Sequence, residues 1–136
     1  MKGAQQMKNI EVVAAIIKNG DKILTTKRGY GDFINMWEFP GGKMESDETK
    51  EDALIREIKE ELKVTISIDS YLCTVQYDYP NFHLTMHCFI CSIIDGELTL
   101  VEHTDAKWLT PDNLDSVQWL PADIQILDHI KSYILR

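Results

Sequence analysis

Apolar residues recur along this chain with two different periods, and together these periods predict a protein of mixed strands and helices. Apolar positions three or four residues apart predict a helix over Lys50–Leu62 and a closing helix over Pro121–Leu135. Runs rich in β-branched and aromatic residues, bounded by turn signals, predict strands. The expected strands are Glu11–Ile17, Lys22–Lys27, Thr65–Ile68, Tyr71–Tyr79, His83–Ile93 and Lys107–Leu109, with a further short apolar stretch at Trp37–Phe39.

The order of these elements indicates how they pack. Strands that come in runs between two helices favour a mixed sheet packed between helices, not a regular alternation of strand and helix. Asn19-Gly20-Asp21 and Asp95-Gly96 are turn signals, and Arg28–Met36 is expected to be a loop. Thr49 is placed to cap the first helix, with Asp52 three residues on. We therefore expect an α/β fold in one domain over residues 1–136.

Each predicted helix has an apolar stripe that should face the sheet. On the first helix the stripe is Leu54, Ile55, Ile58 and Leu62, and on the closing helix it is Ile124, Leu127, Ile130, Tyr133 and Ile134.

The net charge of −8 narrows the choice of partner. Nucleic-acid polymers recruit basic surfaces, so we expect none here. A small phosphorylated molecule remains compatible, because divalent cations can bridge it to an acidic site. No apolar run approaches the ~20 residues of a membrane span, so we expect no membrane partner. The N-terminal residues lack the apolar region of a signal peptide, which makes the cytoplasm the expected location.

The three cysteines are expected to be free thiols, since their number is odd and no export signal is seen. Cys88 and Cys91 match a C-x-x-C spacing. They lie in a predicted strand, however, where positions three apart point to opposite faces. We expect no redox or zinc role for them. His83 and His87 share a strand face, but nothing completes a metal site around them.

Acidic residues on the first predicted helix carry the strongest chemical signal. Glu57, Glu60 and Glu61 occupy an arc of roughly 100° at ~100° per residue. Such carboxylates repel one another unless a cation offsets their charge, and their oxygens suit Mg²⁺ or Mn²⁺. A solvated helix face with ion pairs to Arg56 and Lys59 is the structural alternative.

The wider spacing favours the metal-binding interpretation. Gly42, Glu48 and the run from Arg56 to Val64 resemble the Nudix box, G-x5-E-x7-R-E-U-x-E-E-x-G-U, where U is aliphatic. The second glycine of the pattern is replaced by Lys63. A glycine there usually takes the left-handed conformation, which would cost lysine about 1–2 kcal/mol. The substitution concerns the helix end and not the carboxylates.

The resemblance extends beyond the box and covers most of the chain. Glu38-Phe39-Pro40-Gly41-Gly42, Lys27-Arg28, Glu102-His103 and Leu120-Pro121-Ala122-Asp123 are similar to segments of the MutT-like branch, especially its CTP pyrophosphohydrolase relatives. The resemblance implies a Nudix α/β/α sandwich with a central mixed sheet. It also implies Mg²⁺-dependent hydrolysis of a nucleoside triphosphate to a monophosphate and pyrophosphate, with Mn²⁺ as a possible substitute.

The resemblance also assigns roles to residues. Metal ligands would be Gly41, Glu57, Glu60, Glu61 and Glu102. The carboxylate that orients or deprotonates water would be Glu57 first and Glu61 second. Arg28, Glu38 and Asp123 would bind the substrate, with Arg28 on a terminal phosphate. Gly42, Glu48 and Arg56 would be structural parts of the box, with Arg56 paired to Glu48 or Glu60.

Several alternatives stay open for the substrate and for Asp123. The leading substrates are CTP or dCTP and 8-oxo-dGTP, but ADP-ribose or a dinucleotide polyphosphate would suit a relative of the same family. A non-catalytic nucleotide-binding module is a third choice, although it would be expected to lack some of the box carboxylates. Asp123 could read the base edge or simply stabilise a helix start. An ionised aspartate there would favour bases that offer donors, such as cytosine and guanine.

Among the remaining residues, Glu102 has the role of an ordinary loop acid as its alternative, and we favour the functional role. Aromatic residues that could stack on a base are Trp37, Tyr77, Tyr79 and Phe82. The oligomeric state, monomer or homodimer, is not indicated by the sequence.

Overall fold

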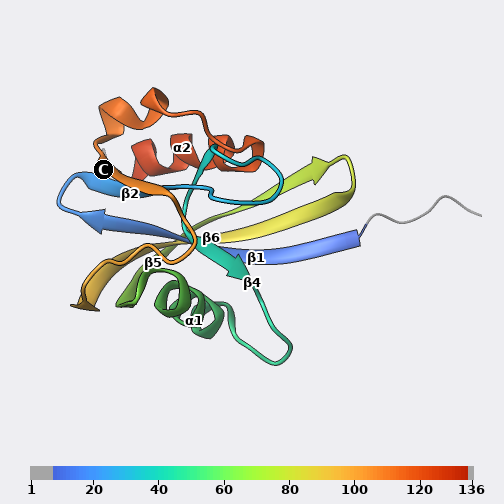
Figure 1. Ribbon diagram of the computed structural model, residues 1–136, viewed down its shortest axis with the longest axis horizontal. Helices are drawn as coiled ribbons and strands as arrows, with labels where there is room; N and C mark the ends of the chain where they lie inside the picture. Colours follow the sequence, from blue (N-terminus) through green and yellow to red (C-terminus); the bar gives the residue numbers. More distant parts are fainter. Residues whose placement is uncertain (1–7, 135–136) are drawn as a thin grey trace, which may run out of the picture.

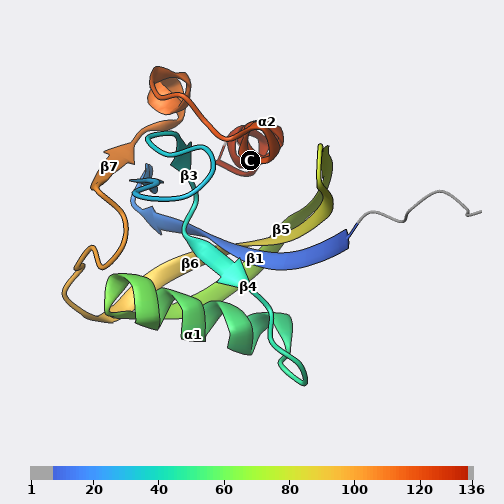
Figure 2. The ribbon, with the colours of Figure 1, turned by 45° about the vertical axis from the view of Figure 1, so that its right-hand side comes forward.

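The computed structural model describes residues 8–134 as a twisted sheet between two helices (Figure 1). Helix α1 (Lys50–Leu62) covers one face, and helix α2 (Pro121–Ile134) covers the other with the short 3-10 helix η1 (Pro111–Ser116) (Figure 2). This arrangement confirms the expected α/β fold with a mixed central sheet. No helix in the described part of the chain is both long enough and apolar enough to cross a membrane.

The sheet of the described residues has seven strands. They are β1 (Lys8–Asn19), β2 (Lys22–Lys27), β3 (Trp37–Glu38), β4 (Gly41–Lys43), β5 (Val64–Tyr79), β6 (Phe82–Gly96) and β7 (Asp105–Leu109). The main order is β3-β2-β1-β6-β5, with β4 beside β1 and β7 beside β2. β1 runs parallel to β6, while the other pairs are antiparallel. One edge of β1 is shared between β4 and β2, so the sheet divides there.

Side chains that alternate along the strands contribute to two separate hydrophobic cores, one on each face of the sheet. Successive side chains of a strand point to opposite faces. Cys88 accordingly packs on the α2 side and Cys91 on the α1 side, which confirms that the two thiols face apart. All three cysteines are free, as expected, and the structure places all three in the interior.

Two expected breaks between strands were wrong. Thr65–Ile68 and Tyr71–Tyr79 form one strand, β5, whose pairing with β6 shifts register between them. The break at Asp69 is absorbed because its carboxylate accepts hydrogen bonds from the Ser67 and Ser92 hydroxyls. Asp95-Gly96 is not a separate turn, because both residues still pair with β5.

Strand β4 was not predicted at all. Gly41 and Gly42 have low strand propensity, since they offer no side chain to pack. A Cβ on Gly41 would collide with the Val13 carbonyl of β1, so glycine is what lets the two backbones pair. Tertiary contact rather than local propensity forms this strand.

The helices keep their expected bounds as far as the structure describes them. Leu135, the expected end of the closing helix, lies outside the described residues. Ile55 on α1 and Ile124 on α2 are exposed rather than part of the apolar stripes. The buried α2 stripe runs through Ala122, Asp123, Ile126, Leu127 and Ile130 instead.

The two ends of α1 explain how it is bounded. The Thr49 hydroxyl accepts a hydrogen bond from the Asp52 N–H at 3.0 Å, as expected for an N-cap. Lys63 ends the helix at φ 61° and ψ 27°, in the left-handed conformation that glycine would take without strain. Lysine therefore adopts the geometry of the glycine it replaces.

Candidate active site

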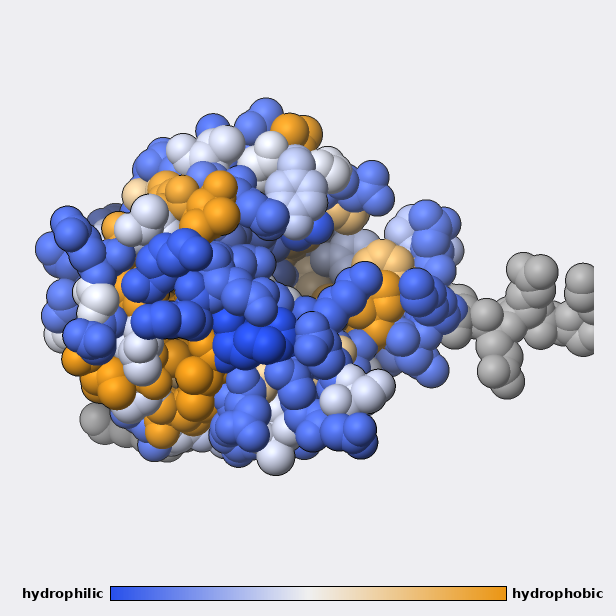
Figure 3. All heavy atoms as spheres, turned by 60° about the horizontal axis from the view of Figure 1, so that its bottom comes forward, coloured by the Kyte–Doolittle hydropathy of each residue, from blue (hydrophilic) through white to orange (hydrophobic). Residues whose placement is uncertain are grey.

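A cavity of about 460 Å³ lies beside β1 and β4. Its walls come from β1, β4, β6, the loop after β2, the loop before β7, and the facing sides of α1 and α2. In Figure 3, which brings the α1 side forward, hydrophilic residues surround a hollow whose interior is paler and partly hydrophobic. The cavity therefore combines a polar rim with an apolar interior.

Carboxylates gather at the α1 end of this cavity. Glu57 and Glu61, one helical turn apart, line it together with Glu102 from the loop before β7. Gly41 and Gly42 of β4 line it as well. A Cβ on Gly42 would collide with the Glu57 carboxylate, so the glycine leaves the space that this carboxylate occupies.

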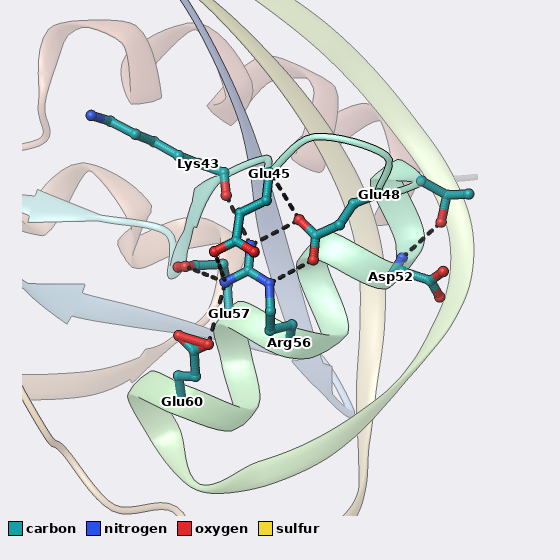
Figure 4. Close-up of polar contacts among 8 residues, drawn as sticks. Lys43, Glu45, Glu48, Asp52, Arg56, Glu57 and Glu60 are labelled. Atoms are coloured by element: carbon teal, nitrogen blue, oxygen red, sulfur yellow. Dashed lines mark hydrogen bonds and ion pairs between the residues drawn. The ribbon is translucent and has the colours of Figure 1, made fainter.

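Arg56 holds the loop before α1 against the helix (Figure 4). Its Nε and Nη2 donate to the two Glu48 oxygens at 2.6 and 2.9 Å, a bidentate pair, and Nη2 also donates to the Lys43 carbonyl at 3.1 Å. The expected pairing of Arg56 with Glu48 is therefore present. It lowers the pKa of Glu48 to about 2 and raises the pKa of Arg56 above its usual value.

Glu60 lies apart from the other box carboxylates. Its side chain is 59% exposed, does not line the cavity, and accepts from Arg56 Nη1 at 3.3 Å. Figure 4 shows the Glu60 carboxylate directed toward this arginine. Glu57 also contacts Arg56 Nη1, at 3.3 Å, but lines the cavity as well. The structure thus brings together Glu57, Glu61 and Glu102, and leaves Glu60 outside.

Burial and mutual repulsion change the acidity of the two lining helix carboxylates. Burial raises the pKa of Glu61 to about 7, and Glu57, Glu38 and Glu102 add to the rise. Burial also raises the pKa of Glu57, against the lowering effect of Arg56. Carboxylates that are crowded together in a partly desolvated site are expected to have raised pKa values. An added cation would relieve this repulsion.

His103 is a cavity residue to which the sequence assigned no role. Its side chain is only 6% exposed, and its Nε2 lies 3.3 Å from Glu38 Oε2 and 3.9 Å from Glu61 Oε2. Glu38 in turn accepts from Arg28 Nη1 at 2.8 Å. These contacts connect Arg28 to the carboxylate end. The Glu102-His103 pair was visible in the sequence, but only folding brings His103 to Glu38.

The opposite end of the cavity is apolar and holds one buried acid. Asp123 is 5% exposed and accepts a hydrogen bond from the Phe39 N–H at 2.9 Å. Burial raises the pKa of Asp123 to about 8, and Glu38 adds to the rise, whereas the Phe39 bond and Arg28 lower it. Below this pKa the carboxyl group carries a proton, and a protonated acid can donate as well as accept.

Aromatic residues divide between this end and the core. Tyr79 and Phe82 line the cavity, their rings stacked at a centroid distance of 5.0 Å. Tyr77 and Trp37 do not line it and pack in or against the α2-side core. Phe33, which the sequence did not single out, lines it from the loop after β2.

The other histidine candidates lie elsewhere. His87 contacts Glu11 and Thr74, and His83 contacts Asp78 and Gln76, outside the cavity. Within residues 8–134, no group of three histidine, cysteine or acidic side chains is arranged to hold a metal ion as it stands. Even so, the donor set fits a hard cation. Carboxylate oxygens with raised pKa values line one cavity beside a strand of two glycines, and oxygen donors suit Mg²⁺.

Comparison with known proteins gives these features a context. A sequence model of the NUDIX domain matches residues 12–129. The CTP pyrophosphohydrolase of Escherichia coli strain K12 is 37% identical over 123 residues, covering 90% of this chain and 91% of that protein. The 8-oxo-dGTP diphosphatase of the same strain is 30% identical over 127 residues, covering 92% and 98%.

Two further matches bear on substrate and fold. The ADP-ribose pyrophosphatase of Methanocaldococcus jannaschii is 38% identical over 124 residues, covering 90% of this chain and 71% of that protein. The solution structure of the Escherichia coli ORF135 protein superimposes with a TM-score of 0.82 at 35% identity, covering 94% of this chain and 92% of the other. The fold is thus shared with a solved structure, and the sequence match extends over most of the chain.

Proposed function

The chain belongs to the Nudix family of phosphoanhydride hydrolases, and we propose that it is a magnesium-dependent nucleoside triphosphate diphosphatase. Water would attack a phosphorus of the triphosphate, and the products would be a nucleoside monophosphate and pyrophosphate. The leading substrates are CTP or dCTP and 8-oxo-dGTP, in line with the names of two relatives.

One observation carries this proposal: a single cavity joins a cluster of carboxylates to an apolar end that contains one buried acid. A nucleoside triphosphate has a matching division, with a polyanion at one end and an apolar ring with polar edges at the other. Arg28, which lines the same cavity, can neutralise a terminal phosphate by a bidentate contact.

Nudix hydrolases generally use divalent metal ions, and we propose Mg²⁺ for this one. When bound, such an ion polarises phosphorus and acidifies water. Glu57, Glu61, Glu102 and the Gly41 carbonyl would hold it, a proposal supported by the position of all four residues along the cavity wall. Glu60 belongs to the proposed set by its position in the box, although its carboxylate contacts Arg56 outside the cavity.

The remaining steps fall to side chains of the chain itself. Glu57 would orient or deprotonate the attacking water, with Glu61 as the second choice. Arg56 holds Glu48 and the loop, and so fixes where Glu57 points. Asp123 would bind the base edge, and as a carboxylic acid near neutral pH it can donate as well as accept.

ADP-ribose is the second candidate substrate, because a relative with that specificity in its name is 38% identical. The carboxylate end would act on its pyrophosphate in the same way. The two substrates differ in the group attached to the second phosphorus, and the products separate them. Hydrolysis of ADP-ribose gives AMP and ribose 5-phosphate, without free pyrophosphate.

The experiment is a substrate panel with Mg²⁺ that resolves the products by chromatography. The panel holds the canonical ribo- and deoxyribonucleoside triphosphates, 8-oxo-dGTP, ADP-ribose and a dinucleotide polyphosphate. We expect a monophosphate and pyrophosphate from at least one triphosphate, at a kcat/KM well above that for ADP-ribose. Phosphate as the first product, or ADP-ribose as the best substrate, would contradict the proposal.

A further inference from the structure

The loop between β2 and β3 has an unusual backbone. Gly31, Phe33 and Asn35 all have positive φ, at 75°, 64° and 71°. Glycine adopts this region freely, and asparagine does so more often than most residues. A bulky aromatic residue rarely does, because its Cβ crowds the following carbonyl. Backbone stability alone therefore favours glycine at position 33, and the ring is what phenylalanine adds.

Hydrogen bonds within the loop keep Phe33 in this conformation. The Arg28 N–H donates to the Met36 carbonyl at 2.9 Å, and the Asn35 N–H donates back to the Arg28 carbonyl at 2.9 Å. The Met36 N–H donates to the Phe33 carbonyl at 3.1 Å. The loop is closed at its base and turned at Phe33, so the side chain has a defined direction.

That direction is into the apolar end of the cavity. The Phe33 ring lies 5.4 Å from the Tyr79 ring, tilted by 54°, and lines the cavity together with Tyr79 and Asp123. The Tyr79 hydroxyl accepts from the N–H of Ala122, the residue next to Asp123. Phe33 is 39% exposed, so part of the residue remains open.

We propose that Phe33 is a nucleobase-binding residue that stacks on the base whose edge Asp123 contacts. This inference rests on the proposed function and adds a residue to it. Aromatic stacking suits any base, because every base has a π-face, while Asp123 distinguishes base edges. Backbone strain is commonly retained at positions that bind a ligand, and the positive φ of Phe33 fits this pattern.

Phe33 could instead have a purely structural role as a cover over Tyr79, and its variants would then behave differently. Three substitutions separate the two roles. Phe33→Tyr keeps the aromatic face, Phe33→Leu keeps apolar bulk without it, and Phe33→Gly removes both and the backbone strain. Asn35→Gly is the matched control, since Asn35 also has a positive φ but does not line the cavity.

The test measures kcat and KM on the best nucleotide of the panel, together with the denaturation midpoint of each variant. We expect Phe33→Leu and Phe33→Gly to raise KM by about 10-fold or more, the scale of a lost base–aromatic stack, with kcat within about threefold. Phe33→Tyr and Asn35→Gly should keep the wild-type KM. Phe33→Gly should be no less stable than wild type.

The outcomes also separate this inference from the proposed function. A wild-type protein that hydrolyses no nucleotide contradicts the proposed function. An active wild type with an unchanged KM in Phe33→Leu overturns the stacking role alone. So does an equal rise of KM in Asn35→Gly, because the loop rather than the ring would then matter.

Discussion

The two ends of the cavity use the same chemical group under opposite conditions. At the α1 end, Glu57, Glu61 and Glu102 crowd one another beside Arg56. At the α2 end, Asp123 is buried and accepts from the Phe39 N–H, with Glu38 and Arg28 as charged neighbours. Burial raises the pKa values of Glu61 and Asp123 alike, to about 7 and about 8.

The two ends differ in what offsets the energetic cost of their buried carboxylates. Several carboxylates in one space repel one another, and a divalent cation removes that repulsion. A single buried carboxyl is relieved by one proton, and then becomes a neutral hydrogen-bonding group. One end is therefore suited to a cation and its phosphates, and the other to the neutral edge of a base. A substitution at one end can therefore be compared with a substitution at the other end as its control.

The largest effect should come from removal of the cation. With EDTA and no divalent ion, nucleotide hydrolysis should become undetectable, because nothing then offsets the carboxylates and the polyanion together. Readdition of Mg²⁺ or Mn²⁺ should restore it. The measurement is pyrophosphate release over a titration of Mg²⁺. Full activity in chelator would show that the carboxylate end does not work through a metal.

Glu57→Gln should come next. We expect kcat to fall by about 10²–10⁴-fold, the usual worth of a positioned acid or base, and further if a metal ligand is lost. Glu51→Gln, an exposed acid on the first turn of the same helix, is the control and should keep wild-type kcat. Glu57→Gln within threefold of wild type would remove Glu57 from the mechanism. Circular dichroism checks that both variants fold.

At the other end, Asp123→Asn should alter how stability depends on pH. A raised pKa means that the folded state holds the proton more tightly than the unfolded state. Its stabilising contribution is therefore complete below about pH 4 and is lost as pH rises to about 8. Glu61 acts in the same direction but only up to about pH 7.

Between pH 7 and 8, comparison of wild type with Asp123→Asn isolates Asp123, because Glu61 titrates in both proteins. Without divalent ions, the wild-type unfolding free energy should fall there by up to about 1.4 kcal/mol. Asp123→Asn, which keeps an oxygen to accept from Phe39, should show a flatter profile in urea titrations. Parallel profiles for the two proteins would mean that Asp123 titrates normally.

The smallest effect should come from Lys63→Gly, which touches neither end. Glycine relieves the left-handed backbone at the end of α1 but adds freedom to the unfolded chain. We expect a net gain of about 0.5–1 kcal/mol in unfolding free energy, within the cost of left-handed backbone for lysine. Kinetic constants should stay unchanged. A loss of stability would show that lysine is not strained there.

Much of the carboxylate end was predictable from sequence because its information is local. Residues Gly42 to Val64 contain the helix, its cap at Thr49 and the spacing that brings Glu57 and Glu61 to one side. Arg56 and Glu48 are eight positions apart, so their contact is expected once that helix is predicted. Glu60 shows the limit of such local prediction. It lies on the same helix arc, yet its carboxylate contacts Arg56 and is largely exposed.

The rest depended on long-range contacts that no local pattern encodes. Strand β4 exists because Gly41 can approach Val13, and His103 meets Glu38 across 65 positions of sequence. Phe33 and Asp123 come from opposite parts of the chain. Their residue types fit many environments, so only the fold shows that they face one space.

The measurement that tests the central claim most directly is the nucleotide ranking of Asp123→Ala beside that of Glu57→Gln. We expect Glu57→Gln to lower kcat/KM for every nucleotide and keep their order. Above about pH 8, where Asp123 is ionised and only accepts hydrogen bonds, wild type should favour CTP, dCTP or guanine nucleotides over UTP and dTTP. Asp123→Ala should shrink that ratio and leave the Mg²⁺ requirement unchanged. An Asp123→Ala variant with the wild-type ranking would contradict the division of the cavity into a phosphate end and a base end.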